Sequence, residues 1–187
     1  MRHKVKIALK LVILVMLAVF SSYTVQAQTW TQVNTDGFGD PNNTLIRSMS
    51  VFDGNLYAGT GNATTGCEVW KYDGTNWTQA NTDGFGNSDN TFACSMKAGL
   101  GSLLVGTKNE ATGCEIWYYD GSNWVQYASG GFDDPNNIMA ASSAGFEGSL
   151  YIGTTNEVTG TEVWKFDGTN WVQVNIDGFG DVNNVHT

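Results

Sequence analysis

A tryptophan recurs every 47 residues through most of the chain. The four copies, with no insertion or deletion between them, are Trp30, Trp77, Trp124 and Trp171. Each is followed by a related polar segment, which runs from Asn34 to Asn43 in the first copy and takes a looser form from Ala128 to Asn137 in the third. A fixed period of this length indicates a repeat architecture, in which each unit buries its faces against its neighbours.

The units run over residues 30–76, 77–123 and 124–170, and a partial unit follows at 171–187. Their apolar residues fall in short runs bounded by turn residues, without a sustained helical period, and such runs predict β-strands. After Trp30 we expect strands at 45–52, 55–60, 67–72 and 77–80, with copies 47 and 94 residues further along. Asp-Gly pairs between them, as at Asp53-Gly54, favour tight antiparallel hairpins.

The predicted fold class is all-β, built from β-propeller blades of four antiparallel strands. Four short strands in about 45 residues make one blade, because so small a sheet must bury its faces between neighbours. The chain holds about three complete blades and a lone fourth-type strand at Trp30 to Val33. Closed rings have roughly four to eight blades, so we expect an unclosed ring. A truncated reading frame and an oligomer that completes the ring both remain open, and exposed blade edges would favour self-association.

The order of residues within each unit resembles a kelch repeat. A glycine-containing strand, Leu56 to Thr60, is followed by a strand ending at Tyr72 and then by Trp77. The turn from Asp73 to Trp77 is similar to the Asp-box of sialidase-type propellers. The spacing departs from both families, and Gly59-Thr60 stands where kelch repeats have paired glycines. The resemblance implies a propeller fold at superfamily level and does not imply one function.

Residues 1–27 have the pattern of a secretory signal peptide. Basic residues precede an apolar stretch at 11–20, and Val25 to Ala27 offers a small-residue cleavage site. The uncharged apolar run is about half of the roughly 20 residues that a membrane-spanning helix needs. We therefore expect cleavage after Ala27, a repeat region at 28–187, and a secreted, periplasmic or cell-surface protein that is not an integral membrane protein.

Export would leave a strongly acidic chain. All 18 acidic residues follow the signal, but only five of the nine basic residues do. Binding to nucleic acid requires a basic patch that offsets phosphate repulsion, so we expect no nucleic-acid partner. A glycan or a protein is the expected ligand.

Because the four strands of a blade are antiparallel, the loop that enters the first strand and the loop between the second and third strands lie on the same face. These are the long polar loops, and the tight turns lie on the opposite face. Loops on a rigid scaffold usually carry function, so the Asn/Asp-rich face is the expected binding face. Its candidate ligand-binding residues are Asp36, Asp40, Asn43, Asn62, Glu68, Asp83, Asn90, Asn109, Glu115, Asn137, Asn156 and Glu162. Two other interpretations stay open: these side chain types cap turns, and Asp36, Asp40 and Asn42 offer oxygen ligands for Ca²⁺ without EF-hand spacing. We expect no other cofactor and no other metal.

Enzyme signatures are largely absent from the sequence. The two histidines are His3, in the signal, and His186, so no Ser-His-Asp triad or histidine metal site can form within the blades. The three cysteines, Cys67, Cys94 and Cys114, leave the disulfide pairing open.

We therefore expect a binding or interaction module and not an enzyme. Two alternatives remain: a purely architectural repeat region of a larger surface or sensor protein, and a hydrolase-type propeller that uses a carboxylate pair. A catalytic pair is normally unique, whereas Glu68 has a copy in every unit. A site that occurs once in the chain would need residues that are present in one unit and absent from the others, and few residues meet this condition.

Overall fold

The computed structural model describes residues 28–99 and 101–186, and it is all-β. Twelve strands form one antiparallel sheet that is not closed. The described residues divide after Val33, and all twelve strands belong to the part that begins at Asn34. Within the described ranges, no helix has the length and apolar character needed to cross a membrane.

The sheet consists of three four-stranded units, and in each one every strand pairs with the next along the chain. Unit one contains β1 (Leu45–Phe52), β2 (Asn55–Gly61), β3 (Val69–Tyr72) and β4 (Trp77–Gln79). Unit two contains β5 (Phe92–Gly99), β6 (Ser102–Lys108), β7 (Ile116–Tyr119) and β8 (Trp124–Ala128). Unit three contains β9 (Asn137–Phe146), β10 (Ser149–Asn156), β11 (Val163–Phe166) and β12 (Trp171–Gln173).

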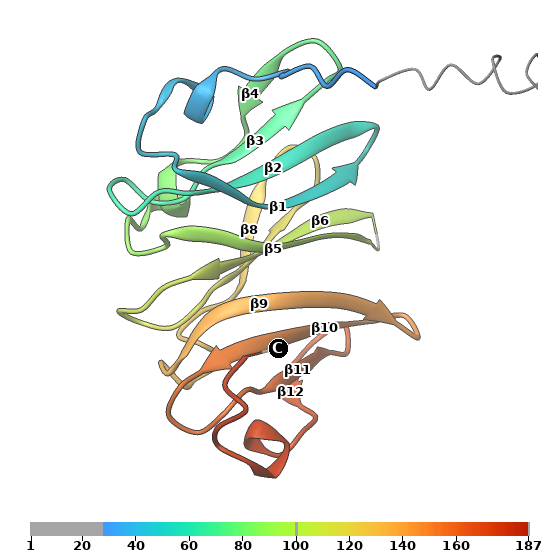
Figure 1. Cartoon of the computed structure of the whole chain (residues 1–187). Coiled ribbons are helices and arrows are strands. Elements are labelled where there is room, and N and C mark those ends of the chain that lie inside the picture. The colour runs from blue at the N-terminus through green and yellow to red at the C-terminus, as the bar shows by residue number, and fades with distance from the viewer. Residues whose placement is uncertain (1–27, 100, 187) are drawn as a thin grey trace, which may run out of the picture. The chain divides into compact units, whose positions relative to one another are not determined.

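Neighbouring units are joined along the sheet by one residue pair each. Gly61 of β2 pairs with Phe92 of β5, and Lys108 of β6 pairs with Met139 of β9. In Figure 1 the units follow one another from β1 in blue-green to β12 in red, and the first strands β1, β5 and β9 lie side by side. The long loops gather on one side of the units and the hairpin turns on the other (Figure 1).

Small residues allow the units to approach closely. A Cβ atom on Gly59 would lie 2.6 Å from the Cβ atom of Ala93 in the next unit, and one on Gly106 would lie 2.5 Å from that of Ala140. These glycines belong to the repeated Gly-Thr pair. Packing between units therefore requires glycine there.

Apolar side chains fill two junctions between the units. Junction one lies between units one and two, and its buried cluster includes Tyr57, Val69, Met96, Leu103 and Tyr119. Junction two lies between units two and three, and its buried cluster includes Leu104, Ile116, Phe132, Ala140 and Ile152.

The predicted strands are confirmed in number and order for these three units, although β9 begins two residues earlier and β10 ends two residues later than expected. Two further differences have a clear structural cause. The third strands begin two residues later than expected, as at Val69, because the N–H of Cys67 donates to the carbonyl of Asn90 in the following loop. The strand expected at Trp30 to Val33 is absent from the described residues, because the third strand of each unit already pairs with its own fourth strand.

The expected turn chemistry is present between the third and fourth strands. The carboxylate of Asp73 accepts the N–H groups of Asn76 and Thr75, at 2.7 and 2.8 Å. These bonds hold the pKa of Asp73 below its usual range. The turn is thus closed by the aspartate side chain, as in an Asx-turn.

An aromatic ring fastens each polar loop to its unit. Phe85 lies in the short 3₁₀ turn η2 (Asp83–Gly86), with a φ of 58°. Its ring stacks on Trp117 at 4.8 Å and meets the edge of Trp124 at 5.0 Å. Phe38, in η1 (Asp36–Gly39), and Phe132 make the same pair of contacts in the other units, whereas Phe179, in η3 (Asp177–Gly180), is exposed.

Candidate functional site

The candidate residues of the loop face form a buried hydrogen-bond network, which is clearest in unit two. The Asn90 amide donates to the Glu115 carboxylate at 2.8 Å and to the Gly84 carbonyl at 2.9 Å. The indole N–H of Trp117 donates to the same carboxylate oxygen at 2.8 Å. The amide oxygen of Asn90 in turn accepts from Asn109 at 3.1 Å. A buried carboxylate with two donors is well satisfied without any ligand.

The network recurs in all three units. Asn43, Glu68 and Trp70 form its first copy, with bonds of 2.7 and 2.6 Å to the carboxylate. Nine of the twelve residues predicted for the loop face are buried members of these networks: Asn43, Asn62, Glu68, Asn90, Asn109, Glu115, Asn137, Asn156 and Glu162.

The network also binds each unit to the next. The Asn90 carbonyl accepts the N–H of Cys67 in unit one, at 2.7 Å. The N–H of Gly84 donates to the Cys67 carbonyl at 2.8 Å. The loop of residues 81–90 thus bridges unit one, through its backbone, and unit two, through the Asn90 side chain. This arrangement supports a structural role for the buried asparagines and glutamates.

The other three predicted residues lie nearer the surface. Asp36 is exposed and lines a hollow of about 200 Å³. One carboxylate oxygen of Asp40 accepts from Asn42 and the other from Asn62, at 2.9 and 3.0 Å. Asp83 accepts from Gln79 at 2.6 Å. Among the residues that the structure describes, no group of three or more His, Cys, Asp or Glu side chains is arranged to hold a metal ion.

The three cysteines are free and buried. Burial raises the pKa of the Cys94 thiol to about 12 and moves those of Cys67 and Cys114 in the same direction. A thiolate is the reactive form of cysteine, so these side chains pack as apolar groups.

Stability should depend on the titration of Glu162. Burial raises its pKa, and the bonds from Asn137 and Trp164 oppose that rise. The folded protein therefore holds this proton to higher pH than the unfolded chain does, whose glutamate pKa is about 4.3. The stability that protonation contributes is full below the unfolded pKa and is lost as pH rises through the folded one. We expect Glu162→Gln, which cannot titrate, to gain stability relative to wild type between about pH 4 and pH 7. Urea denaturation of both proteins at about pH 4 and pH 7 measures their free energies of unfolding. If the difference between variant and wild type were the same at both pH values, the prediction would be wrong.

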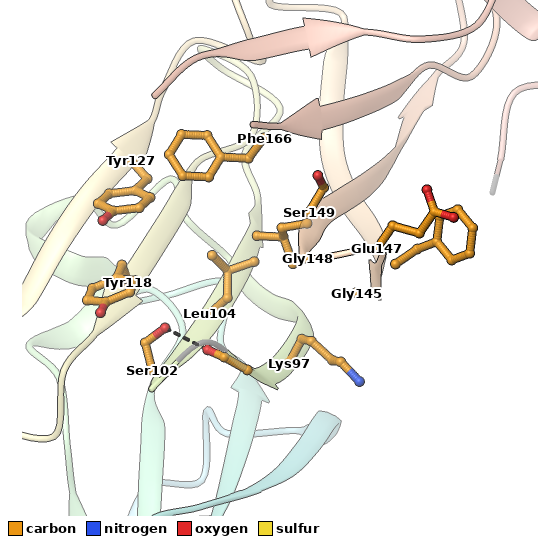
Figure 2. Close-up of a pocket in the computed structure, with 13 residues that line it drawn as sticks. Lys97, Ser102, Leu104, Tyr118, Tyr127, Gly145, Glu147, Gly148, Ser149 and Phe166 are labelled. Carbon is orange, nitrogen blue, oxygen red and sulfur yellow. Dashed lines mark hydrogen bonds between the residues drawn. The ribbon is translucent and has the colours of Figure 1, made fainter. Parts of the chain in front are cut away.

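A cavity of about 410 Å³ opens at junction two, on the hairpin-turn side of the units. Unit two contributes six lining residues: Lys97, Gly99, Ser102, Leu104, Tyr118 and Tyr127. Unit three contributes its β9–β10 hairpin, from Gly145 to Leu150, and Phe166 of β11. Figure 2 shows the aromatic rings of Tyr118, Tyr127 and Phe166 on one side of this space, and Lys97 and Glu147 on the other.

The cavity exists because unit two departs from the repeat. Units one and three carry Phe52 and Phe146 at the end of the first strand, where unit two has Gly99. They carry Tyr57 and Tyr151 on the second strand, where unit two has Leu104. In junction one, Phe52 and Tyr57 pack against each other and against Tyr119, with ring centroids 6.0 to 6.4 Å apart. The corresponding volume in junction two is not filled by side chains.

A β-bulge brings Tyr127 into the same space. In unit one the N–H of Val69 donates to the Asn81 side chain at 2.6 Å, and β4 ends at Gln79. Unit two has Ala128 in place of Asn81, so Ile116 pairs with the Ala128 backbone instead, and Tyr127 becomes the extra residue of the bulge. A bulge re-aims a side chain. Here the Tyr127 ring stacks on Tyr118 at 4.9 Å.

One hydrogen bond that crosses junction one has no counterpart at junction two. The indole N–H of Trp124 donates to the carbonyl of Ala80 at 2.7 Å. Trp171 is the equivalent residue, and its buried indole nitrogen has no partner. The bulge at Tyr127, the equivalent of Ala80, accounts for the difference. The two junctions therefore differ in backbone as well as in side chains.

These cavity residues were not predicted from the sequence, but the sequence contains their signal. Unit two is the odd copy at Gly99, Leu104 and Tyr118, where units one and three agree. No family model matches the chain, and no curated protein matches it. The functional assignment therefore rests on the geometry of this cavity.

Proposed function

We propose that the chain is an exported ligand-binding module whose four-stranded units are blades of a β-propeller, and that its ligand occupies the cavity at junction two. The 47-residue period, the antiparallel meanders and the close face-to-face packing support the blade assignment. Residues 1–27, which carry the signal-peptide pattern, lie outside the described residues.

One observation carries the proposal. Three departures from the repeat, at Gly99, Leu104 and Tyr118, meet in a single cavity, which the bulged Tyr127 also lines. A void that lacks a ligand costs packing contacts, of the order of 1 kcal/mol for each missing methyl-sized group. A concave, mostly apolar site with a few polar groups at its edge is the usual form of a small-molecule site.

The lining of the cavity favours binding over catalysis. Its described lining residues include one carboxylate, Glu147, one ammonium group, Lys97, and the hydroxyls of serine and tyrosine. Glycoside hydrolysis requires two carboxyl groups facing one bond. The arrangement therefore suits a protein that binds and releases its ligand without chemical change.

An architectural repeat region is the second candidate, and the buried Asn–Glu–Trp networks favour it. They account for nine residues of the loop face without a ligand. This alternative predicts that nothing binds at junction two, so the same experiment separates the two functions.

Filling the cavity is expected to abolish binding. Gly99→Phe with Leu104→Tyr gives unit two the residues of units one and three, and a Cβ atom on Gly99 meets no atom within 4 Å. The double variant should gain about 1–2 kcal/mol of stability, as cavity-filling and glycine-removing changes do. Thr78→Tyr, on the exposed β4 strand, serves as the matched control and should bind like wild type.

The measurement is two-dimensional NMR with methyl-labelled Leu104 and Leu150, titrated with methyl glycosides, aromatic amino acids and short peptides. We expect at least one class to shift these methyl resonances in wild type and in Thr78→Tyr, and to leave Leu150 unshifted in the filled variant. The proposal fails if no class shifts them, or if the filled variant binds as wild type does.

A further inference from the structure

We infer that the ligand of this cavity is a free small molecule with one aromatic ring and a short charged tail, the chemistry of an aromatic amino acid. The inference rests on the proposed function and names the ligand class for that same site. It starts from what the chain itself places in the equivalent space at junction one.

Junction one contains an aromatic ring where junction two contains the cavity. Phe52 is the last residue of β1, and its ring crosses to the next unit, where it reaches within 4.0 Å of the position of a Gly121 Cβ atom. It packs on Tyr57 and meets Tyr119 edge-on, at 6.1 and 6.4 Å. The equivalent residue in unit two is Gly99. The space at junction two is therefore that of a phenyl ring which the chain does not supply.

Tyrosine and phenylalanine rings line the cavity, and two of them have no aromatic counterpart in unit one. Tyr118 and Tyr127 stack with an interplanar angle of 12°, and Tyr127 lies 5.4 Å from Phe166 at 45°. The equivalents of Tyr118 and Tyr127 in unit one are Lys71 and Ala80. Aromatic pairs favour offset-stacked and edge-on arrangements at centroid distances of about 4.5–7 Å. An additional ring can meet these three in such arrangements, whereas a saturated ring lacks the matching quadrupole.

The charged groups lie away from Tyr118 and Tyr127 (Figure 2). Figure 2 shows Lys97 and Glu147 on the side of the cavity opposite Tyr118 and Tyr127. Both are exposed, and neither takes part in an ion pair among residues 28–99 and 101–186. A ligand whose ring lies against Tyr127 directs its tail toward these groups. A tail with both a carboxylate and an ammonium group can pair with Lys97 and Glu147 at once.

Apolar cavities in proteins can bind small aromatic molecules. An engineered protein cavity of about 150 Å³ lined by apolar side chains takes up benzene. The present cavity has about 410 Å³, which accommodates a ring with a tail. For a ligand of about twelve heavy atoms, a Kd of roughly 1 mM or tighter is expected.

The test is the same methyl NMR titration of the full chain, with four probes: L-phenylalanine, L-cyclohexylalanine, N-acetyl-L-phenylalaninamide and methyl β-glucoside. We expect L-phenylalanine to shift the Leu104 and Leu150 methyl resonances, and to bind at least 5-fold more tightly than cyclohexylalanine, which has a six-membered ring of similar size without the π-system. The neutral amide derivative should bind several-fold more weakly than the zwitterion. In Lys97→Gln with Glu147→Gln, that difference should disappear.

Equal binding of phenylalanine and cyclohexylalanine would overturn the aromatic assignment, and equal binding of the zwitterion and its neutral derivative would overturn the tail assignment. Shifts with the glucoside alone would overturn this inference and leave the proposed function standing. If none of the four probes, and none of the other compounds tested above, shifts these resonances, both fail.

Discussion

Gly66→Ala is expected to lower the free energy of unfolding by about 3–5 kcal/mol, whereas Gly74→Ala should lower it by about 1–2 kcal/mol. The backbones of the two glycines are nearly the same, with φ of 99° and 97°. Positive φ strains alanine equally at both sites, by roughly 1–2 kcal/mol. The difference must come from the surroundings.

Those surroundings are backbone atoms at Gly66 and open space at Gly74. A Cβ atom on Gly66 would lie 2.6 Å from the Cα atom of Gly84 and 2.7 Å from its nitrogen, while one on Gly74 meets nothing within 4 Å. The N–H of Gly84 is held by the Cys67 carbonyl at 2.8 Å, so the loop cannot move without losing a bond. Overpacking of this kind costs about 1–3 kcal/mol beyond the strain.

Urea denaturation of the two variants measures this difference directly. Gly113 and Gly160 repeat the Gly66 contact, with Cβ distances of 2.6 and 2.7 Å to the next loop, so Gly113→Ala should match Gly66→Ala. Equal losses for Gly66→Ala and Gly74→Ala would mean that the loops of neighbouring units do not pack as closely as the structure has them.

The strands could be predicted from the sequence because every repeat has the same short apolar runs bounded by turn residues. Asp53-Gly54 and the turn at Asp73 fixed the hairpins, and the structure places the turns there. The late start of the third strands was not predictable. It depends on a bond from Cys67 to Asn90, 23 residues away, which local patterning does not encode.

The loop-face residues were chosen for their type, and type does not distinguish a ligand contact from an internal one. Asn90 and Glu115 are hydrogen-bonding residues on polar loops, as a ligand site requires. The structure turns them toward each other and buries them. Their recurrence in every unit fits the packing of every unit on the next.

The cavity was hidden for the opposite reason. The departures at Gly99, Leu104 and Tyr118, and the tyrosine at 127, are visible when the three units are aligned. They lie on four different strands or strand ends, and only the packing of unit two on unit three brings them together. The repeated positions therefore predict the strands, whereas the proposed site is formed at positions where unit two differs from the other units.

Asn90→Ala should be among the most destabilising single changes in the chain, at about 4–5 kcal/mol. The side chain donates to Gly84 and Glu115 and accepts from Thr107 and Asn109. Its removal leaves the buried Glu115 carboxylate with one fewer donor. It also leaves buried polar atoms of Gly84, Thr107 and Asn109 without this hydrogen-bond partner. Each neutral group left unsatisfied costs about 1–3 kcal/mol, and a charged one more.

Asn184→Ala is the matched control, because Asn184 is the same residue of the last polar loop. It is exposed, and its amide donates to Gly178 at 2.9 Å as that of Asn90 does to Gly84, but no glutamate of a following unit receives its second bond within the described residues. We expect it to cost about 1 kcal/mol, the net value of one hydrogen bond. Chemical denaturation of both variants gives the comparison. If the two losses were equal, the Asn90–Glu115 contact would not stabilise the fold, and these residues would again be candidates for binding a ligand.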